Sequence, residues 1–305
     1  MLMRFHMPRR AARACSTSTS ATNRAYNHCV DIVREHDRER YICNLHAPAH
    51  ARPGLFALHA FNFETAKLRK STTEESASRL RTGWWRMTLE QALKRGAPPP
   101  GHPVALALSH AHAHYRLTSR YLYQLLDARE ADMRTLQPRT HAELQTYCEH
   151  TAGSLMLLGL QCVGVVDCEA AERAAAFAGT SLGLATLLRA TSLHARAGCT
   201  YLPADVTTRH GVSLSAMLGG SASPEACDAV AEVADEAVAH LLAARSMAPN
   251  VPAAARAVLL PATVADQILM RLERNAYNVF ASDALEPLGL RLQLALLWRR
   301  LNGSY

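Results

Sequence analysis

Three histidines in one short run, His110, His112 and His114, are the first candidates for metal chemistry. His110 and His114 are four residues apart, so a helix would place both on one face, as in the zinc-binding helix of a metalloprotease. Such a helix also carries a glutamate between its histidines, whereas here the intervening neighbours include Ala111 and Ala113. We therefore interpret the run as a histidine stripe that faces solvent or a partner.

The acids Asp127, Glu130 and Asp132 form a second group that could hold a cation. They stand in the sequence DAREADMR, beside Arg129 and Arg134. Because carboxylates interleaved with arginines on one helix tend to pair with them, the pattern favours a solvated helix end over a metal site.

Motifs for covalent catalysis and for nucleotide binding are missing from the sequence. No serine lies in a nucleophile elbow, and Gly219-Gly220 lacks the lysine and the hydroxyl residue of a phosphate-binding loop. The cysteines do not have the spacing of a zinc site, so we expect free, small, buried thiols and predict no cofactor or metal ion. These cysteines are Cys15, Cys29, Cys43, Cys148, Cys162, Cys168, Cys199 and Cys227.

The elements that position these residues are predicted to be helices. Apolar residues recur at helical spacing, and no window shows the convincing alternation that is typical of a strand. One alanine-rich helix begins near Asp167, and another begins at Ser223, where a capping serine precedes a proline in the first turn. The loops 95–103 and 218–224 are too short to be interdomain linkers. The sequence therefore predicts one all-α domain over residues 28–305.

The last predicted helix carries an apolar stripe on one face and arginines largely on the other. We expect the stripe to close the domain's own core; the alternative is a peripheral contact with a membrane or an acidic partner. The longest nearly apolar stretch, Leu155 to Val166, is shorter than the roughly 20 residues that span a bilayer, so no transmembrane helix is predicted. The stripe consists of Leu290, Leu294, Leu297, Trp298 and Leu301, and the arginines are Arg291, Arg299 and Arg300.

The positive charge of the chain is concentrated at its N-terminus. The 305 residues have a formal net charge of +7, and residues 1–30 contribute five arginines and no acid, which leaves +2 for the rest. This balance does not indicate a nucleic-acid-binding body. The N-terminal segment is rich in Arg, Ser and Thr, a composition typical of a mitochondrial transit peptide, which we predict for residues 1–27. A disordered basic tail is the alternative.

Three segments resemble the squalene/phytoene synthase superfamily in order and spacing. The first joins RERYICNLHAPAHARPGLFALHAFNFETAKLRKS to RLRTGWWRMTLEQAL, the second is TYCEHTAGSLMLLGLQCVGV, and the third is SLGLATLLRATSLHARAGCTYLPADVTTRHGVS. With the helical spacing between them, the segments cover nearly the whole chain after the N-terminal segment. The resemblance implies a helical bundle of the isoprenoid synthase type around a central cavity, and we expect this cavity to persist.

The residues that carry activity in this superfamily are changed here. Active members join or rearrange prenyl diphosphates, whose phosphates are held by Mg²⁺ ions on two aspartate motifs. The positions that match these motifs are Ala66, Lys67 and Lys70 in the first and Ala190 and His194 in the second. Lysines at a cation site make Mg²⁺ binding unfavourable. The resemblance therefore implies a catalytically inactive member, a pseudoenzyme.

Four residues are candidates for holding an anion or another ligand without a metal ion. Three are cations, Lys67, Lys70 and Arg189, and the fourth is Tyr201. For the cations we favour the alternative that they are solvated or paired with nearby acids.

Further strings resemble a narrower group, the non-catalytic mitochondrial branch of the superfamily. They are HAFNFETAK, the Trp84-Trp85 pair, LLRAT, YLP and RHGVS. This resemblance implies a role in building early, membrane-proximal parts of respiratory complex I (NADH:ubiquinone oxidoreductase) at the matrix side of the inner membrane, with its assembly intermediates as partners. Adjacent helical residues point in different directions, so one of the tryptophans is expected in the core and the other is a candidate partner or membrane contact, together with Trp298, Arg299 and Arg300.

Two other functions stay open at this point. The first is a permanent structural component of a large mitochondrial particle, either a respiratory complex or a ribosome-biogenesis intermediate, and only there would the chain contact nucleic acid. The second is a residual enzyme that acts on an isoprenoid or another lipid without a metal ion.

Overall fold

Helices form all of the regular structure in the described part of the chain, which confirms the predicted all-α fold. The computed structural model describes the backbone of residues 9–70, 75–97, 101–220 and 222–305, and within these ranges it has no strand. The side chains of residues 9–19, 70 and 75–78 lie outside the description. The elements are α1 (Arg9–His36), α2 (Arg38–His46), α3 (Arg52–Lys70), α4 (Glu75–Leu93), α5 (Pro103–Tyr115), α6 (Ser119–Asp132), α7 (His141–Cys148), the π-helical turn η1 (Glu149–Gly153), α8 (Ser154–Cys162), α9 (Glu169–Arg189), α10 (Thr191–Arg196), α11 (Ala204–Arg209), α12 (Leu214–Leu218), α13 (Pro224–Ser246), the 3₁₀ turn η2 (Ala248–Asn250), α14 (Ala253–Leu259), α15 (Pro261–Arg274) and α16 (Gly289–Leu301).

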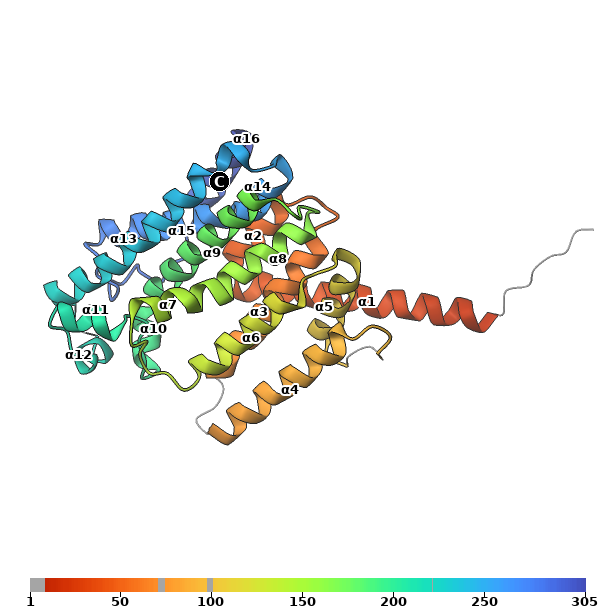
Figure 1. Cartoon of the computed structure of the whole chain (residues 1–305), viewed down its shortest axis with the longest axis horizontal. Coiled ribbons are helices and arrows are strands. Elements are labelled where there is room, and N and C mark those ends of the chain that lie inside the picture. The colour runs from red at the N-terminus through yellow and green to blue at the C-terminus, as the bar shows by residue number, and fades with distance from the viewer. Residues whose placement is uncertain (1–8, 71–74, 98–100, 221) are drawn as a thin grey trace, which may run out of the picture.

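The long helix α9 lies at the centre of the bundle. It packs against α13, α15 and the continuous segment α7–η1–α8 (Figure 1). Its buried residues are mostly small, and they allow close helix packing. A Cβ atom on Gly179 would lie 2.5 Å from the Cα of Gly153 in η1, so the two backbones are in contact there and only glycine fits.

The first helix joins the domain through its C-terminal half. Helix α1 packs against α3 and α5, and its N-terminal end projects away from the bundle (Figure 1). Cys29 and Val33 are buried, and so are Thr22 and Ala25, two residues of the predicted presequence. The helix runs unbroken through the predicted boundary at residue 27, and the transit peptide itself stays a prediction.

Neither the cysteines nor the histidine run forms a metal site within the described residues. Five of the cysteines are buried and free, as predicted, whereas Cys168 and Cys227 are free but partly exposed, and the side chain of Cys15 lies outside the description. Within the described part, no three His, Cys, Asp or Glu side chains lie close enough together to hold a metal ion. His110 and His114 are exposed on α5.

One helical stretch in the described residues is long and apolar enough to cross a membrane by length and composition. It runs over Ala253–Arg274 and comprises α14 and α15. The prediction from Leu155–Val166 did not single it out. Because 61% of its most apolar 18-residue segment is buried inside the protein, we interpret the stretch as two helices of the core.

The expected packing of the last helix is wrong. The apolar stripe that was expected to close the core is exposed to solvent, with Leu290 at 74% and Leu301 at 77% exposure, while Leu292 and Leu296 on the other face are buried. Helix α16 carries leucines on both faces. It packs against α2 and α15, and Leu292 and Leu296 are its buried residues.

Candidate functional site

A cavity of about 430 Å³ lies between α3, α6, α9, α10 and the α7–η1 segment. It is the central cavity that the family resemblance implies. Its wall contains three of the residues that the resemblance matches to the aspartate-motif positions, Ala66 on α3, Ala190 after α9 and His194 on α10. The first and third segments of the chain therefore meet at this cavity. The π-helical turn η1 contributes Thr151 and Ala152 to the same wall, and such turns in helices are frequent at functional sites.

Two of the three cations that the sequence offers as anion contacts, Lys67 and Arg189, do not line the cavity. Lys67 is 45% exposed, pairs with Glu64 at 3.0 Å and lies over the ring of Phe63. Arg189 forms two hydrogen bonds with Glu39, at 2.6 and 2.8 Å. These pairs match the alternative favoured from the sequence. The side chain of Lys70 lies outside the description.

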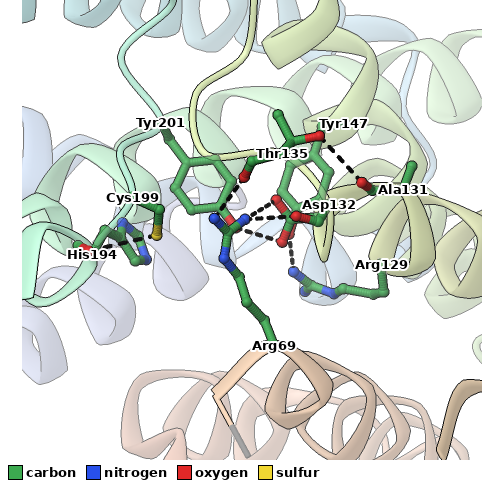
Figure 2. A network of polar contacts seen from close by, with 9 residues as sticks. All are labelled: Arg69, Arg129, Ala131, Asp132, Thr135, Tyr147, His194, Cys199 and Tyr201. Carbon is green, nitrogen blue, oxygen red and sulfur yellow. Dashed lines mark hydrogen bonds and ion pairs between the residues drawn. The ribbon is translucent and has the colours of Figure 1, made fainter. Parts of the chain in front are cut away.

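Asp132, at the end of α6, is the centre of a buried polar network (Figure 2). One of its oxygens accepts a hydrogen bond from Arg69 at 2.5 Å, and the other accepts one from the hydroxyl of Tyr201 at 2.6 Å. The prediction of a solvated helix end is therefore wrong for Asp132, which is 8% exposed. It holds for Asp127 and Glu130, which pair with Arg86 near the surface.

Arg69 ties α3 to the loop that follows α6. It also donates to the backbone carbonyls of Asp132, at 2.8 Å, and Thr135, at 2.7 Å. Burial alone would lower the pKa of Arg69, but the neighbouring Tyr201 and Asp132 raise it above its usual value. Burial also raises the pKa of Tyr201, so this phenol keeps its proton and donates a hydrogen bond to Asp132.

A second arginine, Arg129, approaches the network from α6 (Figure 2). It donates to the hydroxyl of Tyr147 and, at 3.0 Å, to the side-chain oxygen of Asn62. Burial raises the pKa of Tyr147 to about 12, so this hydroxyl is neutral at physiological pH. The sequence reasoning missed Asn62, Arg69, Arg129 and Tyr147 as site residues and rejected Asp132. Asn62, Arg69 and Tyr147 stand in the family-like segments HAFNFETAKLRKS and TYCEH, which was the signal that could have found them.

The residues at the cavity do not fit the Mg²⁺ ions on which active synthases depend. Mg²⁺ requires several oxygen ligands in octahedral geometry, usually including one or two carboxylates. Asp132 is the only acid among the described residues of the wall, and its oxygens already serve Arg69 and Tyr201. The three wall positions that the resemblance matches to the motifs hold two alanines and a histidine.

The tryptophans divide between core and surface, as expected. Trp85 is buried against Phe61, with ring centroids 5.5 Å apart, and Trp84 is 46% exposed. On α16, Trp298 is 59% exposed. Its neighbour Arg299 turns back to Asp266, at 3.4 Å, whereas Arg300 is exposed near His46.

Comparison with known proteins shows which sequences and folds are similar. A sequence model described as squalene/phytoene synthase matches residues 33–300. The protein named "NADH dehydrogenase (ubiquinone) complex I, assembly factor 6" is 33% identical in Rattus norvegicus, over 98% of this chain and 89% of that protein, and 33% identical in Homo sapiens, over 90% and 82%. Phytoene synthase 3 of Zea mays is 24% identical over 66% of this chain and 48% of its own length.

Two solved structures with a similar fold are named as synthases. The squalene synthase HpnC from Alicyclobacillus acidocaldarius superposes with a TM-score of 0.74 and 21% identity, over 86% of this chain and 99% of that one. A dehydrosqualene synthase solved with a ligand gives a TM-score of 0.78 and 20% identity, over 93% and 98%.

Proposed function

Because the chain belongs to the squalene/phytoene synthase family and resembles complex I assembly factor 6 over almost its full length, we propose that it assists the assembly of mitochondrial respiratory complex I. In this proposal it works at the matrix side of the inner membrane and does not catalyse prenyl transfer. Its partners are assembly intermediates of the complex.

The chemistry of the cavity supports the absence of catalysis. A synthase must hold two diphosphates through metal ions, and the described residues of the wall include one acid, which is already bound to Arg69 and Tyr201. Purified protein incubated with farnesyl diphosphate and Mg²⁺ is expected to release no pyrophosphate. Metal-dependent release that disappears in an Ala190→Phe variant, which fills the cavity, would contradict this part of the proposal.

The observation that carries the proposed location is the exposed face of α16. Five apolar residues at helical spacing form this face, Leu290, Leu294, Leu297, Trp298 and Leu301, and each is at least 48% exposed. Arg291 and Arg300 are exposed on its two sides, and the helix contains no acid. An apolar stripe bordered by arginines fits the boundary between anionic headgroups and acyl chains.

The size of the helix indicates a peripheral contact. Its 13 residues are too few to span a bilayer. Each arginine near an anionic lipid surface contributes about 1 kcal/mol, and the leucines add their burial in the interface. Helix α4 lies at the opposite edge of the molecule (Figure 1) and exposes Leu80, Trp84 and Met87 one turn apart, so a protein partner can be contacted while α16 lies on the membrane.

The test compares two double variants in cells that lack the protein. Leu294→Gln with Leu301→Gln alters the exposed face of α16, and Val238→Gln with Leu242→Gln alters two exposed residues one turn apart on α13. The α13 variant is expected to restore complex I to the wild-type level on native gels and to remain in the carbonate-extractable membrane fraction. The α16 variant is expected to fail in both respects.

Charge provides the second arm of this test. Arg291→Glu with Arg300→Glu should weaken binding to vesicles that contain anionic lipid, and high salt should do the same to the wild type. Arg299 is left unchanged because it pairs with Asp266. Full complementation by the α16 leucine variant, together with a wholly soluble wild-type protein in the matrix, would refute the membrane location.

A further inference from the structure

Helix α4 exposes an apolar face that the rest of the described chain leaves uncovered. Leu80 is 75% exposed and Met87 is 71% exposed, and Trp84 is exposed between them. Together with Gly83 they stand at positions i, i+3, i+4 and i+7, so the four residues share one side of the helix, which we call the α4 face. The opposite side, which includes the buried Trp85, packs against α3, α5 and α6.

Gly83 is not required by the packing of this chain. A Cβ atom at this position would meet nothing within 4 Å, and the backbone there is helical. A glycine inside a helix lowers the stability of that helix. At a contact between two helices, however, glycine lets the backbones approach closely, as Gly179 does against Gly153 in the core. A glycine between Leu80 and Met87 therefore suits a second helix, whereas a lipid surface gains nothing from a missing side chain.

Trp84 is held in place by two neighbouring rings. Its ring centroid lies 5.0 Å from that of Trp85 and 5.4 Å from that of His102, with interplanar angles of 76° and 74°. A side chain that is fixed before binding loses little conformational entropy when a partner buries it. Tryptophan and methionine are also enriched in protein interfaces. The α4 face thus combines a rigid aromatic anchor with Met87 one turn away.

The surroundings of the α4 face are basic. Arg79, Arg81, Lys94 and Arg95 are exposed on α4 or in the turn directly after it. Among the described side chains of the helix, Glu90 is the only acid. Two copies of this chain that met through their α4 faces would bring these cations together in either orientation of the helices. A partner helix with acidic residues beside an apolar stripe is instead complementary in charge.

We propose that the α4 face binds an amphipathic helix of a partner protein, whose apolar stripe is bordered by acidic residues. In this complex the two backbones approach at Gly83, and Trp84 and Met87 are buried between the helices. The inference rests on the proposed function in one respect, since it describes the chemistry of a partner in complex I assembly. Helix α16 lies at the opposite edge of the molecule (Figure 1), so a membrane contact there leaves the α4 face accessible.

The first experiment measures binding of synthetic peptides to the purified full chain. One helical peptide of about 18 residues has leucines at i, i+3, i+4 and i+7 with glutamates on either side, and a second has lysines in place of the glutamates. By fluorescence anisotropy, the glutamate peptide should bind saturably, and added salt should weaken its binding. The lysine peptide should bind about tenfold more weakly or not at all. No saturable binding, or equal binding of the two peptides, would overturn the proposal.

Apolar variants locate the contact. Leu80→Gln with Met87→Gln should weaken binding of the glutamate peptide about tenfold, which corresponds to about 1.4 kcal/mol. Val238→Gln with Leu242→Gln on α13 is the matched control and should bind the peptide as the wild type does. All four side chains are exposed, so neither pair is expected to unfold the protein. Equal affinities of the two double variants would contradict a contact at α4.

Charge variants test the acidic character of the partner. Lys94→Glu with Arg95→Glu should weaken binding of the glutamate peptide, because it reverses the charge beside the α4 face. Arg173→Glu with Arg196→Glu makes the same change of net charge at exposed arginines of α9 and α10, and it should have little effect. If both pairs weaken binding equally, the peptide responds only to net charge and the proposed contact is wrong.

Gly83 distinguishes a helical partner from a membrane. Gly83→Leu should unfold at the wild-type temperature or above it, because leucine favours a helix and finds open space there. The same substitution should weaken binding of the glutamate peptide, since it holds the two backbones apart. Unchanged peptide binding, together with stronger binding to anionic vesicles, would assign the face to lipid and refute the proposal.

Expression in cells that lack the protein separates this inference from the assembly role. Leu80→Gln with Met87→Gln is expected to remain in the membrane fraction but to fail to restore complex I, and photo-crosslinking from position 87 of the otherwise wild-type chain should reach an acidic helical segment of another protein. Full restoration by the variant, or crosslinks only to lipid or to a second copy, would overturn the inference and leave the assembly role intact. A normal level of complex I in cells without the protein would refute the assembly role, whereas the binding of the peptide would be unaffected.

Discussion

Asp132 holds side chains from separate parts of the fold through one carboxylate. Arg69 comes from α3 and Tyr201 from the segment that follows α10, and both are bound to it at hydrogen-bond distance. Losing this negative charge leaves Arg69 buried without a counter-ion. The energetic importance of the residue therefore lies in its partners rather than in its own burial.

We predict that Asp132→Asn destabilises the fold by about 3 kcal/mol, the range found when one partner of a buried ion pair is removed. Asp127→Asn is the control, because Asp127 is 57% exposed in its pair with Arg86 and should cost less than about 1 kcal/mol. Urea unfolding followed by circular dichroism measures both. Equal effects of the two substitutions would show that the network does not contribute as the geometry indicates.

His59 should make stability depend on pH. Burial and the nearby Arg40 lower its pKa to about 3, and Asn44 donates to its Nδ1 at 3.0 Å, so the ring is neutral in the folded protein. The unfolded chain binds a proton below pH 6.5 and the folded one does not, so stability is lost as the pH falls from 6.5 towards 3. The loss is at most about 1.4 kcal/mol per pH unit. His59→Gln should flatten this slope between pH 6.5 and 5; an unchanged slope would assign it to other groups.

The family resemblance predicts some residues of the site, such as Ala66, but not the role of Asp132. Ala66, Ala190 and His194 follow from the family resemblance, and the structure places all three on the cavity wall. Asp132 looks solvated in its local sequence because arginines flank it, yet its partner Arg69 lies 63 residues away. Charge patterns within one helix carry no information about such a distant pair.

In helix α16, the spacing of the apolar residues does not decide which face is buried. Its leucines occupy two faces, and the sequence favoured burial of the larger set. The structure buries Leu292 and Leu296 instead, because the packing of α2 and α15 decides which face is covered. In α9 and α13, which the sequence predicts as helices, small and branched apolar residues at helical spacing are buried, among them Ala178, Leu182, Val233 and Leu241.

A matched pair of leucines tests this orientation. Leu296→Ala should destabilise the fold by about 2–4 kcal/mol, because it leaves a cavity at a buried site. Leu294→Ala, at a side chain that is 68% exposed, should change stability by less than about 0.5 kcal/mol. Thermal and urea unfolding of the two variants decide the matter. The reverse order of effects would mean that the helix is turned by half a revolution, and the proposed membrane face would then be lost.

The predicted transit peptide overlaps with a part of α1 that belongs to the folded bundle. The predicted transit peptide ends at residue 27, but α1 packs against α3 and α5 from Thr22 onward, with Ala25 buried and Tyr26 partly buried. A presequence that is cleaved after residue 27 would remove these contacts. We therefore expect the mature chain to begin before Thr22, so that import removes the basic segment without opening the bundle.

Two truncated chains test this expectation. A chain that begins at residue 22 keeps the buried part of α1, and a chain that begins at residue 28 loses the packing of Ala25 and Tyr26, which is worth about 2 kcal/mol by its apolar burial. For a domain of this size, that difference lowers the midpoint of thermal unfolding by roughly 5 °C. Equal midpoints would show that α1 contributes only after residue 28. Sequencing the N-terminus of the protein from mitochondria then shows which of the two boundaries import uses, since a mature chain that starts at residue 28 would have to tolerate the loss.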